Sequence, residues 1–173
     1  DLDVPPLNPI VGTRAAAGDP ERAGALLAEW IDACQAEGVL ACAKHFPGHG
    51  GADGDSHRAL AVTTKSAEWL WRDELTPFRH AVDAGAAAVM TAHVAYPAID
   101  ASGSPATLSR PILTDVLRGQ LGFDGLIVAD ALEMGGILGA GSEHQVAVWA
   151  IGAGCDLLLA PTDPSGVATA LER

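Results

Sequence analysis

The chain has 173 residues, of which 49% are hydrophobic and 18% are charged, and its formal net charge at pH 7 is −12. This composition is typical of a single globular domain and argues against a disordered chain. The negative charge and the lack of a basic cluster argue against a nucleic-acid partner, and no apolar run approaches the roughly 20 residues of a membrane-spanning helix.

The first part of the chain predicts a helix followed by a buried strand. Asp1–Val4 is typical of the tail of a strand, so we expect earlier elements to be absent from this segment. Asp19 is a predicted helix N-cap, Pro20 the first helical residue and Gly38 the residue that ends the helix. Residues 39–43 form an apolar run, which predicts a buried strand.

The remaining elements alternate in the same way. Ser66 caps a helical region in which Pro77 starts a second helix, and Gly85 ends it. Residues 86–91 predict a strand that leads to His93. The elements expected beyond it are a loop at 105–109, a helix from Pro111 to Gly122, a strand at 126–129, a glycine-rich connection at 135–141, a helix near 142–151, a strand at 156–160 and a final helix near Pro164.

The predicted strands are continuous apolar runs, which indicates a parallel sheet that is covered on both faces. A doubly wound sheet and a (β/α)8 barrel both fit. The barrel is favoured because polar residues follow the predicted strands, at the end where barrel active sites lie; these residues are Lys44, His45, His93 and Asp130. About five strands are found, so the predicted fold is an α/β (β/α)8 TIM barrel, incomplete and lacking the first strands.

The stretch from Lys44 to His57 carries the densest chemistry of the chain. It holds three His, two Asp, one Lys and four Gly within 14 residues. We expect Lys44 and His45 to end a strand and bind a substrate. The glycines predict a pliable loop that carries His57 as an acid/base, oriented by Asp55.

This stretch also resembles a known family. Lys44–Gly50 followed by Asp55–His57 is similar to the signature of family 3 glycoside hydrolases, in particular the bacterial β-N-acetylglucosaminidase branch that acts on peptidoglycan fragments. Further segments resemble strands of the same family, namely Asp3-Val4 with Asn8-Pro9, Gly12-Thr13-Arg14, 89–93 and 127–134. The resemblance implies that residues 1–173 are part of one N-terminal-type catalytic barrel domain.

The resemblance implies a retaining mechanism without a cofactor. Asp130 would be the nucleophile and His57 the acid/base, with Asp55 orienting it. Sugar binding would fall to Lys44, His45 and Arg14. For His93 two interpretations stay open, because it can line the pocket or bind a backbone carbonyl. His49 is interpreted as structural.

Three other functions stay open. A zinc or manganese hydrolase could use the histidines and aspartates of the loop, although their spacing matches no metal motif and Lys44 would oppose a cation. A non-catalytic carbohydrate-binding barrel would keep the sugar contacts without turnover. A family 3 β-glucosidase is the third, and the Asp55-Ser56-His57 sequence argues against it.

The cysteines and tryptophans have simpler interpretations. Cys34, Cys42 and Cys155 are far apart and lie in apolar surroundings, so we expect free core residues. The four tryptophans lie in predicted helices, where packing is a better interpretation than a platform for sugar stacking; they are Trp30, Trp69, Trp71 and Trp149.

Overall fold

The structure is a computed structural model that describes residues 1–2 and 11–173. It has an α/β architecture built on a parallel sheet with the strand order β1-β3-β5. Half of the predicted strand remnant at Asp1–Val4, namely Asp3 and Val4, and the Asn8-Pro9 pair lie outside the described residues. Asp1 and Leu2 themselves belong to no strand.

The strands are short. They are β1 (Cys42–Phe46), β2 (Ala61–Val62), β3 (Ala88–Thr91), β4 (Val94–Ala95) and β5 (Leu126–Val128). The α-helices are α1 (Pro20–Ala36), α2 (Ala67–Trp69), α3 (Thr76–Asp83), α4 (Gly135–Leu138), α5 (Glu143–Ala153) and α6 (Pro164–Leu171). Two 3-10 helices, η1 (Gly12–Arg14) and η3 (Ala106–Leu108), and two π-helices, η2 (Leu70–Glu74) and η4 (Pro111–Gln120), complete the set.

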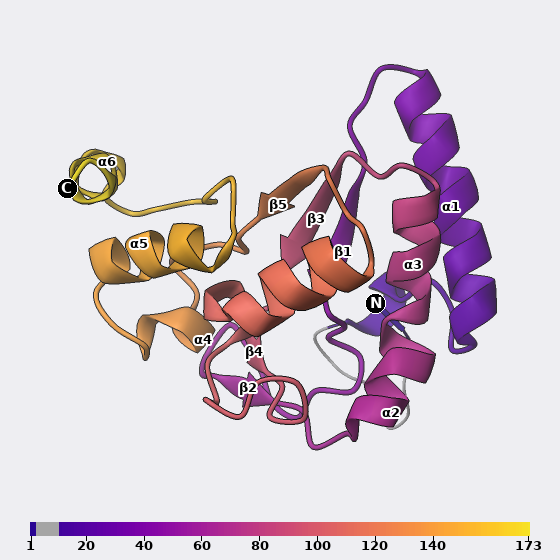
Figure 1. Ribbon diagram of the computed structural model, residues 1–173, viewed down its shortest axis with the longest axis horizontal. Helices are drawn as coiled ribbons and strands as arrows, with labels where there is room; N and C mark the ends of the chain where they lie inside the picture. The colour runs from indigo at the N-terminus through magenta and orange to yellow at the C-terminus, as the bar shows by residue number, and fades with distance from the viewer. Residues whose placement is uncertain (3–10) are drawn as a thin grey trace.

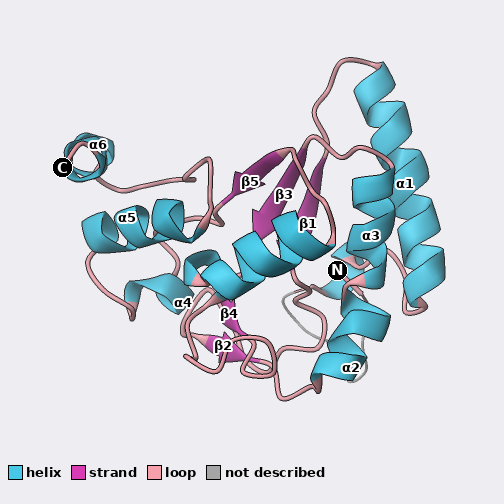
Figure 2. Cartoon of the chain, in the orientation of Figure 1, coloured by secondary structure: helices cyan, strands magenta, loops and turns pink. Residues whose placement is uncertain are grey.

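Helices surround the sheet. Figure 1 shows α1 and α3 side by side near β1, η4 crossing in front of the strands, and α5 and α6 beyond β5. A second parallel sheet, formed by β2 and β4, lies beyond the carboxyl ends of the first sheet. Figure 2 shows that loops gather at this same end. The functional cavity described below therefore lies where connections, not regular elements, dominate.

Pairing is parallel across the three strands of the main sheet, and the register of β1 against β3 shifts between Ala43 and Phe46. Cys42 pairs with Ala88, which pairs in turn with Leu126. The parallel α/β prediction is confirmed. Closure of the sheet into a (β/α)8 barrel stays a prediction.

Local sequence signals placed the helices well. The Asp19 side chain accepts a hydrogen bond of 2.8 Å from the Arg22 backbone N–H, as its predicted role as N-cap requires. Gly38 has a φ of +78°, a left-handed conformation that glycine adopts readily when it ends a helix. Ser66 caps α2 through the backbone N–H of Trp69, so three predicted helix boundaries are confirmed.

The predicted strand at 39–43 is wrong by about three residues. Val39 and Leu40 are 56% and 71% exposed, and pairing begins only where the Ala88 N–H donates to the Ala41 carbonyl. The position of β3 therefore decides where β1 starts. As a result, Lys44 and His45 lie inside β1 and do not follow it.

The predicted strand at 156–160 is also wrong. Only Leu157 forms a bridge with β5, opposite Val128. The Asp156 carboxylate accepts from the Ile127 N–H at 2.8 Å, so a side chain occupies a donor that a ladder carbonyl would otherwise take. Leu157 and Leu159 remain exposed.

Two predicted connections contain short helices. Residues 105–109, expected as a loop, include η3, and the glycine-rich connection 135–141 includes α4. The strands β2 and β4 were not predicted, because two residues are too few to give a hydrophobic period.

One large apolar cluster fills the space between the sheet and its helices. Its fully buried members come from the strands, η2, η4 and the connection after β5, and include Phe46, Leu70, Leu75, Val89, Ile112, Leu113, Leu117, Ile127, Leu132 and Ile137. All three cysteines are free, and Cys155 is buried in this cluster. Trp30 and Trp149 are exposed on α1 and α5.

Among the residues described, none of the helices combines the length and the apolar character needed to cross a membrane.

Candidate active site

A cavity of about 290 Å³ opens at the carboxyl end of the main sheet. Its walls come from η1, β1, the loop after β1 and the segment after β5. The lining residues are Arg14, Lys44, His45, His49, Ser56, His57, Asp130, Ala131, Glu133 and Met134. The cavity thus gathers five of the seven predicted site residues.

Asp130 follows β5 and supplies a carboxylate to the cavity. Its Oδ1 accepts from the Ala131 N–H at 2.8 Å, which fixes the orientation of the carboxyl plane. Its Oδ2 lies 3.8 Å from Nε2 of His45. One oxygen is therefore anchored by backbone, and the other faces the imidazole and the cavity.

His45 is buried and held in place by a second carboxylate. Its Nδ1 lies 2.7 Å from Asp1 Oδ2, and its backbone N–H donates to Asp1 Oδ1. Burial lowers the pKa of His45 to about 4, although the Asp130 carboxylate acts in the opposite direction. The imidazole is thus neutral near pH 7 and suits binding better than proton transfer.

Lys44 and Arg14 bring positive charge to the cavity wall. Lys44 is exposed, whereas the next two residues of β1, His45 and Phe46, are buried. Arg14 comes from η1.

The predicted contact between His57 and Asp55 is present. Nδ1 of His57 lies 3.1 Å from Asp55 Oδ1, and the His57 backbone N–H donates to the same oxygen at 2.9 Å. This backbone hydrogen bond, with a further contribution from the imidazole, lowers the pKa of Asp55. The His57 side chain is 56% exposed and lines the cavity, whereas Asp55 holds it from outside the lining.

His93 does not line the cavity. It is completely buried, with Nδ1 2.8 Å from Thr107 Oγ1 and Nε2 3.0 Å from the Ala131 carbonyl oxygen. Burial lowers its pKa. Of the two interpretations left open by the sequence, the carbonyl contact is the one found, and it supports the residue next to Asp130.

His49 forms part of the cavity wall and links two segments of the loop. It is buried, and its Nε2 lies 2.9 Å from the hydroxyl of Ser56, which is also buried. Its backbone N–H donates to Asp1 Oδ1 at 2.9 Å. Burial lowers the pKa of His49 to about 4, so the neutral ring ties the start of the loop to the residue before His57.

Two carboxyl groups that support the site were missed by sequence reasoning. Asp1 contacts both His45 and His49, as described above. Glu74, in η2, is 1% exposed; its Oε1 accepts from the Gly51 N–H at 2.7 Å, and its Oε2 has no hydrogen-bond partner among the described residues. Burial raises the pKa of Glu74 to about 7. The sequence signal for this buried carboxyl group was a glutamate on an apolar helix face, between Leu70 and Leu75.

The metal interpretation gains no support from the arrangement. Within residues 1–2 and 11–173, no three His, Cys, Asp or Glu side chains are grouped so that they could hold a metal ion. The loop histidines instead have separate partners, as described for His45, His49 and His57.

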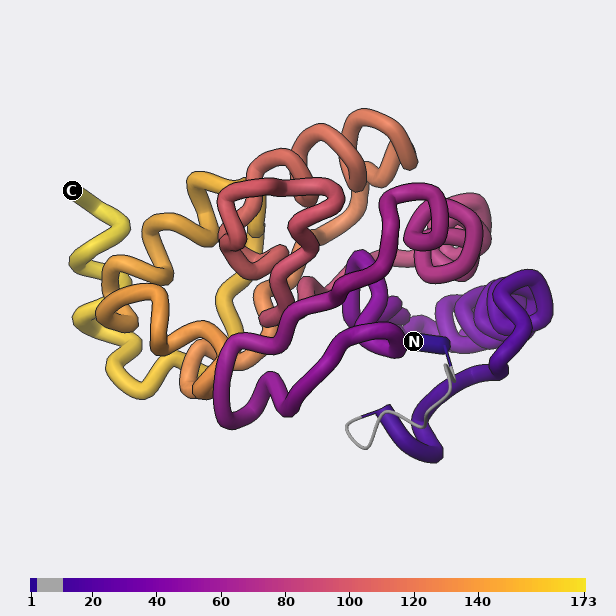
Figure 3. Tube along the Cα trace, turned by 90° about the horizontal axis from the view of Figure 1, so that it is seen from below, coloured from indigo at the N-terminus to yellow at the C-terminus, as the bar shows by residue number. Residues whose placement is uncertain are grey.

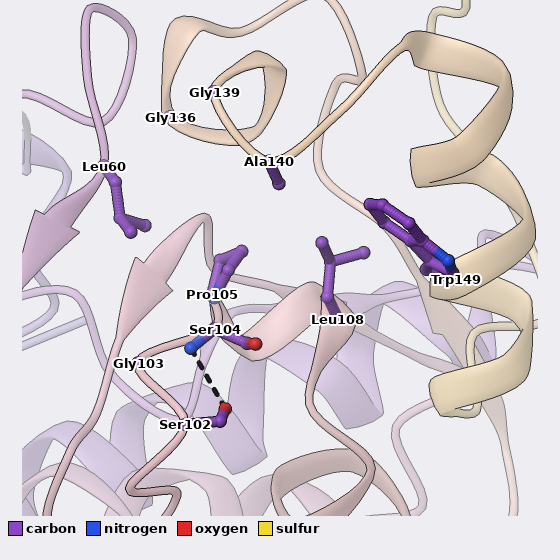
Figure 4. A pocket seen from close by; sticks show the side chains of 10 residues that line it. All are labelled: Leu60, Ser102, Gly103, Ser104, Pro105, Leu108, Gly136, Gly139, Ala140 and Trp149. Carbon is purple, nitrogen blue, oxygen red and sulfur yellow. Dashed lines mark hydrogen bonds between the residues drawn. The ribbon is translucent and has the colours of Figure 1, made fainter.

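A second and larger cavity, of about 530 Å³, lies on the other side of α4. Figure 4 shows Leu60, Leu108 and Trp149 pointing toward it from three different segments. None of the described residues that line it is titratable, so it offers no acid/base chemistry; they are Leu60, Ser102, Gly103, Ser104, Pro105, Leu108, Gly136, Gly139, Ala140 and Trp149.

The sequence matches a family model over its full length. The model, described as the glycosyl hydrolase family 3 N terminal domain, matches residues 1–173. The chain belongs to glycosyl hydrolase family 3.

Two relatives named beta-hexosaminidases are similar in sequence. The chain is 44% identical over 155 residues to a beta-hexosaminidase of Chromobacterium violaceum, covering 90% of this chain and 43% of that protein. It is 43% identical over 162 residues to a beta-hexosaminidase of Pseudomonas aeruginosa, covering 94% and 48% respectively. The chain thus spans about half the length of these curated relatives or slightly less.

Two solved structures share the fold, and one of them is described as a glycoside hydrolase family 3 enzyme. A β-N-acetylglucosaminidase from a Paenibacillus species superposes with a TM-score of 0.95 at 42% identity, covering 99% of this chain and 33% of that one. The beta-glucoside phosphorylase BglX superposes with a TM-score of 0.93 at 30% identity, covering 99% and 33%.

The low pKa of His49 makes a prediction about stability. As the pH falls from about 6.5 to 4, His49 takes up a proton in the unfolded chain but stays neutral in the folded one. The free energy of unfolding therefore decreases over this range. Replacement by glutamine, which can keep the Ser56 hydrogen bond, should reduce this loss by about 2–3 kcal/mol. Denaturant unfolding of full-length His49→Gln and wild type at about pH 7 and 4.5 measures the difference.

His144→Gln is the matched control, because His144 is exposed on α5. An unchanged pH dependence in His49→Gln would contradict the assignment of His49 as a buried neutral histidine.

Proposed function

We propose that the protein containing this chain is a retaining β-N-acetylglucosaminidase that releases terminal β-linked N-acetylglucosamine, with peptidoglycan fragments as the substrate class. The observation that carries the proposal is that Asp130 and the Asp55-paired His57 line one cavity. Membership of family 3 and the similarity to beta-hexosaminidases support the same reaction. Residues 1–173 would be part of one catalytic barrel domain.

The first step forms a glycosyl-enzyme. An oxygen of the Asp130 carboxylate attacks the anomeric carbon, and the bond from this carbon to the leaving oxygen breaks. His57, as imidazolium, gives its proton to the leaving oxygen. A carboxylate on one face of the sugar and a proton donor on the other are what an oxocarbenium-like transition state requires.

The second step releases the sugar. Neutral His57 takes a proton from a water molecule as the water oxygen attacks the anomeric carbon, and the bond to Asp130 breaks. The two displacements restore the original configuration, the Asp130 carboxylate and the protonated His57. Asp55 accepts a hydrogen bond from Nδ1–H of His57, which orients the ring and leaves Nε2 to transfer the proton.

Sugar binding is assigned to the rest of the wall. Lys44 and Arg14 are cationic donors for hydroxyl groups and for the N-acetyl carbonyl. Neutral His45, fixed by Asp1, presents Nε2 beside Asp130. No cofactor is needed, because the nucleophile and the acid/base are both side chains.

Turnover by full-length variants tests the assignment. We expect wild type to hydrolyse nitrophenyl N-acetyl-β-glucosaminide faster than the matching β-glucoside. Asp130→Ala should remove turnover. His57→Ala should lower the rate by roughly 10²- to 10⁴-fold, and more for a sugar aglycone than for nitrophenol, because nitrophenolate leaves without a proton.

His144→Ala is the matched control, since His144 pairs with Asp163 at 3.1 Å but lies away from the cavity. Wild-type rates in Asp130→Ala or His57→Ala would refute the roles. Faster turnover of the glucoside would favour a family 3 β-glucosidase. A wild type that binds sugar without turnover would favour a carbohydrate-binding barrel. Loss of activity in EDTA would favour a metal-dependent hydrolase.

Phosphate in place of water is the second candidate acceptor. Two observations favour it: one structural relative is named a beta-glucoside phosphorylase, and an imidazole repels an incoming anion less than a carboxylate acid/base would. Product analysis with and without inorganic phosphate separates the two. Hydrolysis gives free N-acetylglucosamine in both cases, whereas a phosphorylase gives its 1-phosphate when phosphate is present.

A further inference from the structure

The loop that carries His57 is joined to α4 by two consecutive backbone hydrogen bonds. The Gly135 N–H donates to the His57 carbonyl at 3.0 Å, and the Gly136 N–H donates to the Ser56 carbonyl at 2.9 Å. The first N–H groups of a helix have no partner within the helix, so these loop carbonyls satisfy them. Figure 3 shows the two segments running side by side, the loop in purple and the α4 region in orange.

Glycine is required for this approach. A Cβ at Gly135 would lie 2.5 Å from the Arg58 carbonyl oxygen, and a Cβ at Gly136 would lie 2.5 Å from that of Ser56. Both obstacles are backbone atoms, which cannot rotate away as a flexible side chain can. Any side chain at either position must therefore push the loop and α4 apart.

Gly135 and Gly136 lie in the chain shortly after Asp130. His93 holds this segment through the Ala131 carbonyl, and the Met134 N–H donates to the Ala131 carbonyl at 3.1 Å. α4 starts at the next residue, Gly135. The two hydrogen bonds consequently fix the loop relative to the chain that bears the carboxylate.

Two side-chain contacts also act here: the neighbouring Ser56 hydroxyl lies 2.9 Å from Nε2 of His49, and His57 contacts Asp55. The His57 side chain is 56% exposed and contacts Asp55, which lies only two residues away in the same loop. That contact orients the ring within the loop but does not place the loop over the cavity. The backbone contact with α4 does.

We propose that Gly135 and Gly136 are positioning residues that fix the position of His57 relative to Asp130. The inference rests on the proposed function. Alanine at either position displaces the acid/base while leaving Asp130 in place after β5. Misplacement of a catalytic group by about 1 Å can cost up to roughly 10²-fold in rate.

The test compares two aglycones in the full-length enzyme. For Gly135→Ala and Gly136→Ala we expect kcat/KM to fall at least about tenfold more for a sugar aglycone than for nitrophenol, because only the former needs a proton from His57. The ratio of the two values does not depend on how much of the sample is folded. Gly139→Ala is the control, since a Cβ there meets nothing within 4 Å.

A second measurement uses His57→Ala as background. Adding Gly135→Ala to it should leave the aglycone ratio unchanged, because the positioned group is already absent. An aglycone ratio equal to wild type in both single variants would overturn the inference, as would loss of turnover with both aglycones, which would point to the fold or to Asp130. An inactive wild type would instead refute the proposed function.

Discussion

Parallel pairing of β1, β3 and β5 is the constraint on which the site depends. Parallel strands in register deliver whatever follows them to one edge of the sheet, so the His45 region, His93 and Asp130 meet there. Strands lie about 4.8 Å apart, which places β1 and β5 about 10 Å from each other. Across this edge, Nε2 of His45 in β1 lies 3.8 Å from Oδ2 of Asp130, which follows β5.

Burial divides the histidines of this edge by role. His45, His49 and His93 lose solvent, and the pKa of each falls, so near neutral pH they serve as uncharged hydrogen-bonding groups. His57 differs in being largely exposed and paired with a carboxylate. Among these four histidines, it alone combines access to water with an exposed carboxylate partner, which supports the proposed acid/base role.

Local signals in the sequence predicted the structural features that depend on residues close together in the chain. Helix starts at Asp19 and Ser66 and the parallel nature of the apolar strands came from caps and periodicity. Features that depend on distant partners were not accessible. The start of β1 is set by its pairing with β3. The predicted strand at 156–160 does not form, because a side chain accepts from an N–H of β5. Asp1 and Glu74 support the site through contacts that arise only in the folded protein. The hydrogen bonds of Gly135 and Gly136 are made by backbone and leave no side-chain pattern to read.

The central claim is that Asp130 forms the covalent bond to the sugar. The most direct test incubates the full-length protein with an activated fluorinated N-acetylglucosaminide, which slows breakdown of the glycosyl-enzyme, and maps the adduct by mass spectrometry of peptides. The account predicts one sugar mass on the peptide that contains Asp130, and none in Asp130→Ala. An adduct on another residue, or turnover of the reagent without any adduct after rapid acid quench, would contradict it.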